Sequence, residues 1–238
     1  MTPIAIVGMS TMLPDAPETG SFWRNVLARR DSMSDVPASH WLIEDYFDPN
    51  PAAPDKTYAK RGGFLGSVPF DPMAFGIPPN LLPSTDSTQL LALLVAKRVL
   101  DEASHGQLDK MNPERISVIL GATSAQELVV EMGARLQRPI WAQALREHGY
   151  DEAEIDAVCS RIASLYVPFV ESTFPGLLGN LIAGRIANRF NLGGTNCVTD
   201  AACASSLAAL SMGLAELELG HADLVVTGGV DAMNDPLM

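Results

Sequence analysis

Short apolar runs that end at glycine mark the predicted strands of this chain. Residues 4–7, 116–120 and 224–226 are apolar at almost every position, and residues 195–199 form a further short run. A strand that is apolar throughout is typical of a sheet covered on both faces, whereas a half-exposed strand alternates with polar residues. The pattern therefore predicts a mainly parallel sheet made of buried strands.

Between these runs, apolar residues recur at the spacing of an α-helix. The predicted helices cover residues 22–27, 86–104, 127–136, 140–148, 151–167, 180–190 and 203–219. Ser21 is the candidate cap of the first helix, and we expect Arg185 and Arg189 on the outer side of the helix at 180–190. The helix at 203–219 is apolar on nearly every side, which predicts that it is buried.

The alternation of strands and helices predicts an α/β domain with helices on both faces of the sheet. Two segments interrupt this alternation. Residues 31–84 are rich in proline, and we interpret them as loops and short helices laid over the core. Residues 125–175 form a helical insertion. We therefore expect residues 1–238 to belong to one layered domain with two excursions.

Composition narrows the function classes. The net charge of −12 argues against nucleic-acid binding, which needs lysine and arginine to neutralise phosphates. Three cysteines without paired spacing argue against a disulfide framework or a zinc site, so we expect a reducing, cytoplasmic compartment. No apolar run reaches the ~18 residues that span a membrane. No signal peptide, metal-ligand cluster or cofactor motif is found, and none is required.

The most informative segment is residues 198–207, VTDAACASSL. It passes from an apolar run through a turn of small residues into the helix at 203–219, so Cys203 lies where that helix begins. Free N–H groups and the positive end of the helix dipole favour a thiolate there, and the thiolate is the nucleophilic form. The alternative is a small, buried, structural cysteine at a tight junction. Cys159 and Cys197 are predicted to be packing residues.

The segment DAACASSL, followed by GGVDAM at 228–233, resembles the nucleophile region of β-ketoacyl synthases. The resemblance continues along the chain. It includes PIAIVGM at 3–9, FW at 22–23, VP at 36–37 with Trp41, FDPMAFGI at 70–77 and DSTQLL at 86–91. Two further segments, KRGGF at 60–64 and GIPPN at 76–80, resemble the ketosynthase domains of polyunsaturated-fatty-acid and enediyne-type polyketide synthases.

The resemblance implies the N-terminal half of a thiolase-like fold with αβαβα layers. It also implies that Cys203 accepts an acyl group as a thioester, for decarboxylative Claisen condensation with a malonyl extender. The backbone N–H of Cys203 would form half of an oxyanion hole. The substrate would arrive on the phosphopantetheine arm of an acyl carrier protein, with no cofactor bound to the chain itself.

The same resemblance implies two protein partners besides the carrier protein. The family's two histidines belong to the second half of the domain, so we expect a C-terminal half beyond Met238 to complete the site. We also expect a homodimer whose subunits pair through the strand at 195–199. Two other functions stay open. The chain could be a non-catalytic half-domain that serves as a scaffold for a complementing polypeptide, or a thiolase-fold acyltransferase that performs no condensation.

Overall fold

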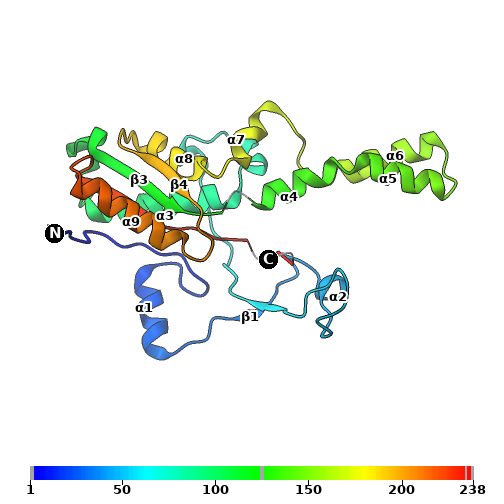
Figure 1. Ribbon diagram of the computed structural model, residues 1–238, viewed down its shortest axis with the longest axis horizontal. Helices are drawn as coiled ribbons and strands as arrows, with labels where there is room; N and C mark the ends of the chain where they lie inside the picture. Colours follow the sequence, from blue (N-terminus) through cyan, green and yellow to red (C-terminus); the bar gives the residue numbers. More distant parts are fainter. Residues whose placement is uncertain (1–2, 124–125, 234, 237–238) are drawn as a thin grey trace.

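A computed structural model describes residues 3–123, 126–233 and 235–236. Its centre is a three-stranded parallel sheet in the order β4-β3-β5 (Figure 1). The strands are β3 (Ile116–Gly121), β4 (Asn196–Thr199) and β5 (Leu224–Gly229). Val118 pairs with Asn196 on one side and with Val226 on the other. The parallel strands predicted at 116–120, 195–199 and 224–226 are confirmed.

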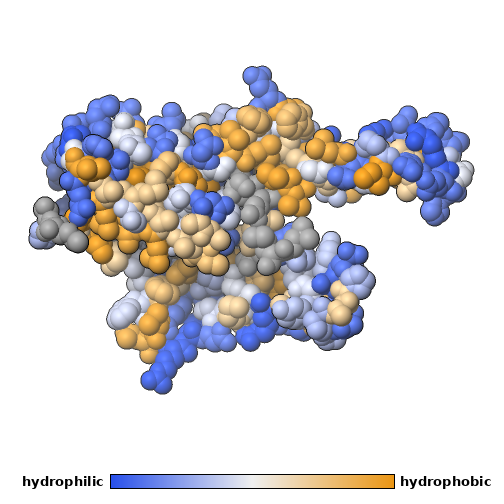
Figure 2. Space-filling model, viewed as in Figure 1, coloured by the Kyte–Doolittle hydropathy of each residue, from blue (hydrophilic) through white to orange (hydrophobic). Residues whose placement is uncertain are grey.

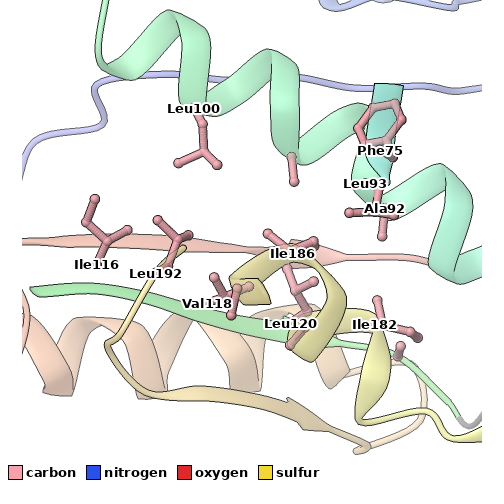
Figure 3. Close-up of a cluster of buried hydrophobic side chains, with 14 of the residues drawn as sticks. Phe75, Ala92, Leu93, Leu100, Ile116, Val118, Leu120, Ile182, Ile186 and Leu192 are labelled. Carbon is pink, nitrogen blue, oxygen red and sulfur yellow. The ribbon is translucent and has the colours of Figure 1, made fainter. Parts of the chain in front are cut away.

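Helices cover both faces of this sheet (Figures 1 and 3). One face carries α3 (Ser87–Ala103) and α8 (Leu181–Phe190), and the other carries α9 (Ser205–Glu218). Successive side chains of a strand point to opposite faces. In β3, all of which is buried, Ile116 and Val118 therefore point towards α3 and α8, while the Ser117 hydroxyl donates to Glu216 of α9 at 3.3 Å. The predicted layered α/β arrangement is confirmed.

The main hydrophobic core lies between β3, α3 and α8 (Figure 3). Its buried members are Phe75, Ile77, Ala92, Leu93, Ala96, Leu100, Ile116, Val118, Leu120, Ala122, Ile182, Ala183, Ile186, Ala187 and Leu192. The carboxylate of Asp86 caps α3 by accepting the Thr88 N–H at 3.0 Å. This cap fixes where the long helix begins, as the sequence predicts.

The strand predicted at residues 4–7 does not form. This segment is extended and exposed, with 81% of Ile6 accessible. It runs beside α3 instead of the sheet, since the Met9 N–H donates to the Glu102 carboxylate at 3.0 Å. An apolar run becomes a strand only where a neighbouring strand supplies hydrogen-bond partners. Within the described residues, no strand pairs with this segment.

The prediction that the helix at 203–219 is buried is also wrong for this chain. Only Ser205, Ala209 and Gly213 of α9 are buried. Gly213 lets the helix approach β5 closely, since a Cβ there would lie 3.0 Å from a Val225 methyl. The opposite face is exposed and carries Leu207, Leu210 and Leu214, and Met212 and Leu219 are also exposed. Figure 2 shows apolar side chains gathered over this part of the molecule.

Residues 19–84 form short elements joined by loops. α1 (Thr19–Ala28) begins after Glu18, so Ser21 is the third helical residue and not the predicted cap. β1 (Ser34–Asp35) and β2 (Arg61–Gly62) form an antiparallel pair. The remaining elements are α2 (Ile43–Tyr46), η1 (Met73–Phe75) and η2 (Pro79–Ser84), with η3 (Leu108–Lys110) and η4 (Pro113–Arg115) following α3.

A helical arm extends from the sheet (Figure 1). It consists of α4 (Gln126–Arg135), α5 (Arg138–Glu147) and α6 (Glu152–Ala163), and η5 (Glu171–Thr173) and α7 (Phe174–Leu177) lead back to the core. Asp151 caps α6 through a capping box with Glu154. The helix predicted to reach residue 167 ends at Ala163, where Arg135 donates to the carbonyls of Ala163 and of Tyr166 in the following turn.

Arg185 is not on the outer side of α8, as its place in the sequence predicts. It is half-buried, and its Nε donates to the Gln89 side-chain oxygen at 2.5 Å. Burial lowers the pKa of Arg185. The fully buried Gln89 amide in turn donates to the Gly176 carbonyl at 3.0 Å. This polar chain joins α3, α8 and the return from the helical arm, so Arg185 has a structural role.

Candidate active site

Cys203 lies in the turn that connects the end of β4 at Thr199 to the start of α9 at Ser205. The helix therefore begins two residues later than predicted, and Cys203 precedes it. Its side chain is exposed. A structural cysteine at a tight junction is expected to be buried, so this exposure disfavours the alternative interpretation of Cys203 and favours a reactive thiol.

The turn around Cys203 has an unusual backbone. Ala202 has a φ of 49°, in the left-handed region that residues with a side chain seldom adopt. Hydrogen bonds surround it: the Ala204 N–H donates to the Ala201 carbonyl at 3.0 Å, and the Ser205 N–H donates to the Ala202 carbonyl at 3.0 Å. The Asp200 carboxylate accepts the Ala202 N–H, also at 3.0 Å. The chain therefore bends sharply immediately before the thiol.

Two glycines bring the carboxyl ends of the strands against this turn. A Cβ on Gly121, at the end of β3, would lie 2.4 Å from the Ser205 carbonyl carbon. A Cβ on Gly229, at the end of β5, would lie 3.0 Å from the Ser206 Cβ. The first turn of α9 is thus in direct contact with the sheet backbone. The sequence pattern did not predict this role for Gly121, although its position at the end of an apolar run was visible.

Cys203 is thus an exposed cysteine at a strained strand–helix turn, at the carboxyl edge of a parallel sheet. Comparison with known proteins shows the family of the chain. The family model described as "Beta-ketoacyl synthase, N-terminal domain" matches residues 1–238. The chain belongs to the β-ketoacyl synthase family.

Several curated synthases are similar to this ketosynthase chain. A polyunsaturated fatty acid synthase polypeptide of Thraustochytrium sp. is 37% identical over 227 residues, which cover 95% of this chain and 8% of that protein. Polyketide synthase GfsA of Streptomyces halstedii is 30% identical over 247 residues, covering 98% of this chain and 3% of that protein. The predicted likeness to polyunsaturated-fatty-acid synthases is confirmed.

Solved structures agree with the family assignment. The oxazolomycin ketosynthase domain OzmH KS7 of Streptomyces albus JA3453 superimposes with a TM-score of 0.71 and 28% sequence identity. The alignment covers 98% of this chain and 34% of that one. The thiolase-like α/β fold is therefore confirmed, and the chain spans about one third of the solved ketosynthase chain that it matches.

The other two cysteines of this ketosynthase chain differ from Cys203. Cys159 is fully buried on α6. Cys197 is half-buried on β4, and burial together with the nearby Glu216 carboxylate raises the pKa of its thiol. A raised pKa keeps a cysteine in its less nucleophilic thiol form. Both positions suit packing residues.

The four histidines lie elsewhere in the chain. The His148 ring lies 2.9 Å from the Ala144 carbonyl at the end of α5, and the His40 ring packs edge-on against Phe64. His105 follows α3. His221 lies beyond the far end of α9, where its Nδ1 is 3.5 Å from the Glu216 carboxylate. None of these positions is part of the turn that holds Cys203.

An open groove with a volume of about 490 Å³ runs between α3, α4 and the segment at residues 65–70. Apolar side chains such as Trp41, Phe70 and Leu91 line it together with Glu127 and Glu131. Burial, followed by the negative charge of Glu127, raises the pKa of Glu131. Cys203 is not among the described residues that line the groove, so the groove is not assigned to the chemistry of the thiol.

Among residues 3–123, 126–233 and 235–236, no helix combines the length and apolar character needed to cross a membrane. In that part of the chain, no group of three or more histidine, cysteine or acidic side chains is arranged to hold a metal ion.

Proposed function

We propose that Cys203 is the acyl-accepting nucleophile of a β-ketoacyl-[acyl carrier protein] synthase. The observation that carries this proposal is the exposed thiol in a strained turn at the start of α9, in a chain that belongs to the family. The Cys203 thiolate attacks the carbonyl carbon of an acyl thioester. The new C–S bond forms as the carbonyl carbon loses the carrier's phosphopantetheine sulfur, which leaves as a thiolate and takes up a proton.

Condensation follows the loading step. A malonyl unit loses carbon dioxide, and the electron pair of the broken C–C bond becomes an enolate. The enolate carbon attacks the acyl carbonyl on Cys203, and the cysteine thiolate leaves. In both steps the attacked carbonyl oxygen becomes an oxyanion, and we propose that the backbone N–H of Cys203 donates one hydrogen bond to it.

The exposed apolar face of α9 supports a second part of the domain as partner. Leu207 and Leu210 on this face are 70% and 42% exposed, and large contiguous apolar surfaces usually mark interaction sites. The matched ketosynthase chain is about three times as long as this one. We therefore propose that the C-terminal part of a ketosynthase domain covers this face.

An acyl carrier protein and a second copy of the chain are the other proposed partners. The carrier protein presents the acyl group on its phosphopantetheine arm. A homodimer is supported by β4, which has β3 on one side and no strand on its other side within the described residues. The three free cysteines are consistent with a reducing, cytoplasmic compartment.

One alternative has structural support. The same apolar face of α9 would serve a non-catalytic scaffold equally well, because any complementing chain could cover it. Retention of an exposed nucleophile favours the catalytic function, since a scaffold has no use for a thiol in a strained turn. An acyltransferase without condensation would pass on the acyl group unchanged, whereas condensation releases carbon dioxide and yields a β-ketoacyl thioester.

Intact-mass spectrometry tests the proposal. The chain is incubated with an acyl-carrier thioester, alone and with the C-terminal part of a ketosynthase domain on a second polypeptide. We expect one acyl adduct that Cys203→Ala abolishes and Cys197→Ala retains. If the folded protein forms no adduct in either setting, the proposed enzymatic function is overturned and the scaffold function is favoured. Carbon dioxide release from malonyl thioester then separates condensation from simple acyl transfer.

A further inference from the structure

Ser205 occupies a position that the nucleophile motif alone does not explain. It is the first residue of α9 and is only 8% exposed, although it adjoins an exposed turn. Its hydroxyl accepts the Ala201 N–H at 2.8 Å and donates to the Ala202 carbonyl at 2.7 Å. One side chain thus bridges the backbone on both sides of the bend that precedes Cys203.

These two hydrogen bonds act on the strained residue. Ala202 has no side-chain reason to adopt a positive φ, because left-handed backbone is favoured only by glycine and, to a smaller extent, by asparagine and aspartate. The surrounding contacts must therefore hold it there. The Ser205 hydroxyl holds the N–H of the preceding residue, Ala201, and the carbonyl of Ala202 itself. Removing the hydroxyl leaves the Ala201 N–H without this acceptor and frees the bend to relax.

Relaxation of the bend moves the thiol. Cys203 directly follows Ala202, so a change in the backbone angles of Ala202 redirects the Cys203 Sγ and its own N–H together. Both groups must meet the same substrate carbonyl, the sulfur at the carbon and the N–H at the oxygen. Acyl transfer depends on that alignment, whereas alkylation by a small reagent depends mainly on access to the thiol.

We propose that Ser205 is a positioning residue for acylation of Cys203: its hydroxyl clamps the bend at Ala202 and so sets the direction of the thiol. The proposal rests on the function proposed for Cys203. It assigns different roles to two adjacent serines. Ser206 is exposed, and no hydrogen bond of its hydroxyl is found within the described chain. Ser206 is therefore the matched control.

The test compares two reactions of the same thiol. Acylation of Cys203 by an acyl-carrier thioester is measured with the chain assembled with the C-terminal part of a ketosynthase domain. Alkylation by iodoacetamide is measured on the same samples, with the modified cysteine identified by peptide mass. Labelling of the half-buried Cys197 reports whether the sheet opens. Circular dichroism confirms that each variant is folded at the assay temperature.

For Ser205→Ala we expect acylation to slow by at least about tenfold, because misplacement by about 1 Å can reduce the rate of a reaction about 100-fold. Alkylation of Cys203 should change by less than about threefold, since its access is unaltered. Ser206→Ala should change neither rate. If Ser205→Ala does not fold, Ser205→Thr and Ser205→Val replace it. They have the same shape, and only threonine keeps the hydroxyl, so acylation should persist in threonine and be lost in valine.

Three results would overturn the inference. Ser205→Ala could acylate at the wild-type rate. Both rates could fall together with increased labelling of Cys197, which would show simple local unfolding. Ser205→Thr and Ser205→Val could acylate equally fast. A wild-type chain that takes no acyl group would instead overturn the proposed function, so the two failures are distinguishable.

Discussion

Substitution of Gly121 by alanine tests whether close contact between β3 and α9 positions the nucleophile. A Cβ at this position would lie 2.4 Å from the Ser205 carbonyl carbon, 2.5 Å from the Ser206 nitrogen and 2.6 Å from the Ser205 oxygen. Non-bonded carbons pack at about 3.5–4.0 Å. The first turn of α9 must therefore move by about 1 Å, because the clashing atoms are backbone and cannot rotate away.

The magnitude follows from two opposing effects. Overpacking of a close contact costs about 1–3 kcal/mol, and contact with rigid backbone favours the upper part of this range. Alanine also restricts the unfolded chain, which contributes about 0.4–1 kcal/mol in the opposite direction. The clash exceeds this gain, so we expect a net loss of about 1–2 kcal/mol in the free energy of unfolding. A shift of about 1 Å in the helix start should also slow acylation of Cys203 by up to about 100-fold.

Gly228→Ala is the matched control. Gly228 pairs with Leu120 at the same edge of the sheet, and a Cβ there meets nothing within 4 Å. Urea denaturation followed by circular dichroism measures the stability of both variants. Gly228→Ala should be as stable as the wild type or slightly more stable. The reasoning is refuted if Gly121→Ala matches Gly228→Ala in stability and also loads acyl groups at the wild-type rate.

Three further predictions concern charge and surface. Glu131→Gln should stabilise the chain at neutral pH, because the raised pKa of Glu131 means that its ionised form opposes folding. The gain in stability should vanish below the ordinary glutamate pKa of 4.5. A gain that persists in acid would show that ionisation of Glu131 is not its cause. The Arg115 guanidinium lowers the pKa of Asp223 through a two-point contact at 2.7 and 2.8 Å, so the pair stabilises the fold above the ordinary aspartate value of 3.8 and loses this effect as pH falls through the lowered pKa. Arg115→Ala should therefore differ from the wild type in urea denaturation at pH 7 and converge with it in strong acid, whereas a constant difference would argue for lost packing. Leu207→Ser should change the stability of the isolated chain by less than about 0.5 kcal/mol, since Leu207 is exposed. It should nevertheless weaken co-elution with the C-terminal part of a ketosynthase domain in size-exclusion chromatography. Unchanged co-elution would show that the outer face of α9 does not contact that part of the domain.

Sequence patterns predicted the elements whose burial partners lie within the chain. The apolar run at 116–120 becomes the central strand because β4 and β5 flank it and α3, α8 and α9 cover it. The helix at 86–104 begins and ends close to the predicted positions, since Asp86 supplies a local cap and Gly106 follows its end with a φ of 71°. In these cases local preference and tertiary packing favour the same structure, so pattern analysis succeeds.

Patterns failed where the partner of an apolar segment is not present. Residues 4–7 and the outer face of α9 are as apolar as the core, but nothing in the described chain covers them. Hydrophobicity indicates that a segment gains free energy by burial and does not identify the surface that buries it. The buried polar chain from Arg185 to Gln89 escaped prediction for the opposite reason, because charged residues are seldom buried unless they are paired.

The sequence predicted a candidate site residue but not the geometry around it. A cysteine at the start of an apolar helix, within a family motif, pointed to Cys203. The supporting roles of Ser205, Asp200 and Gly121 depend on a turn in which an alanine has a positive φ, and alanine gives no sequence signal for that conformation. Ser205 was visible as a polar residue at a helix start, but only coordinates show that its hydroxyl bridges the bend.

The two faces of α9 have different consequences for the nucleophile. The inner face, with Ala209 and Gly213, packs on the sheet within this chain, and the bend before the helix is held by Ser205, Asp200 and the close contact at Gly121. The outer face is exposed, and the proposed partner would cover it. If the proposed function holds, residues of this chain set the direction of the Cys203 thiol, and the proposed C-terminal part of the domain supplies the surfaces that align a substrate above it. A small reagent should consequently alkylate Cys203 already in the isolated chain, whereas rapid acyl transfer should require the assembly.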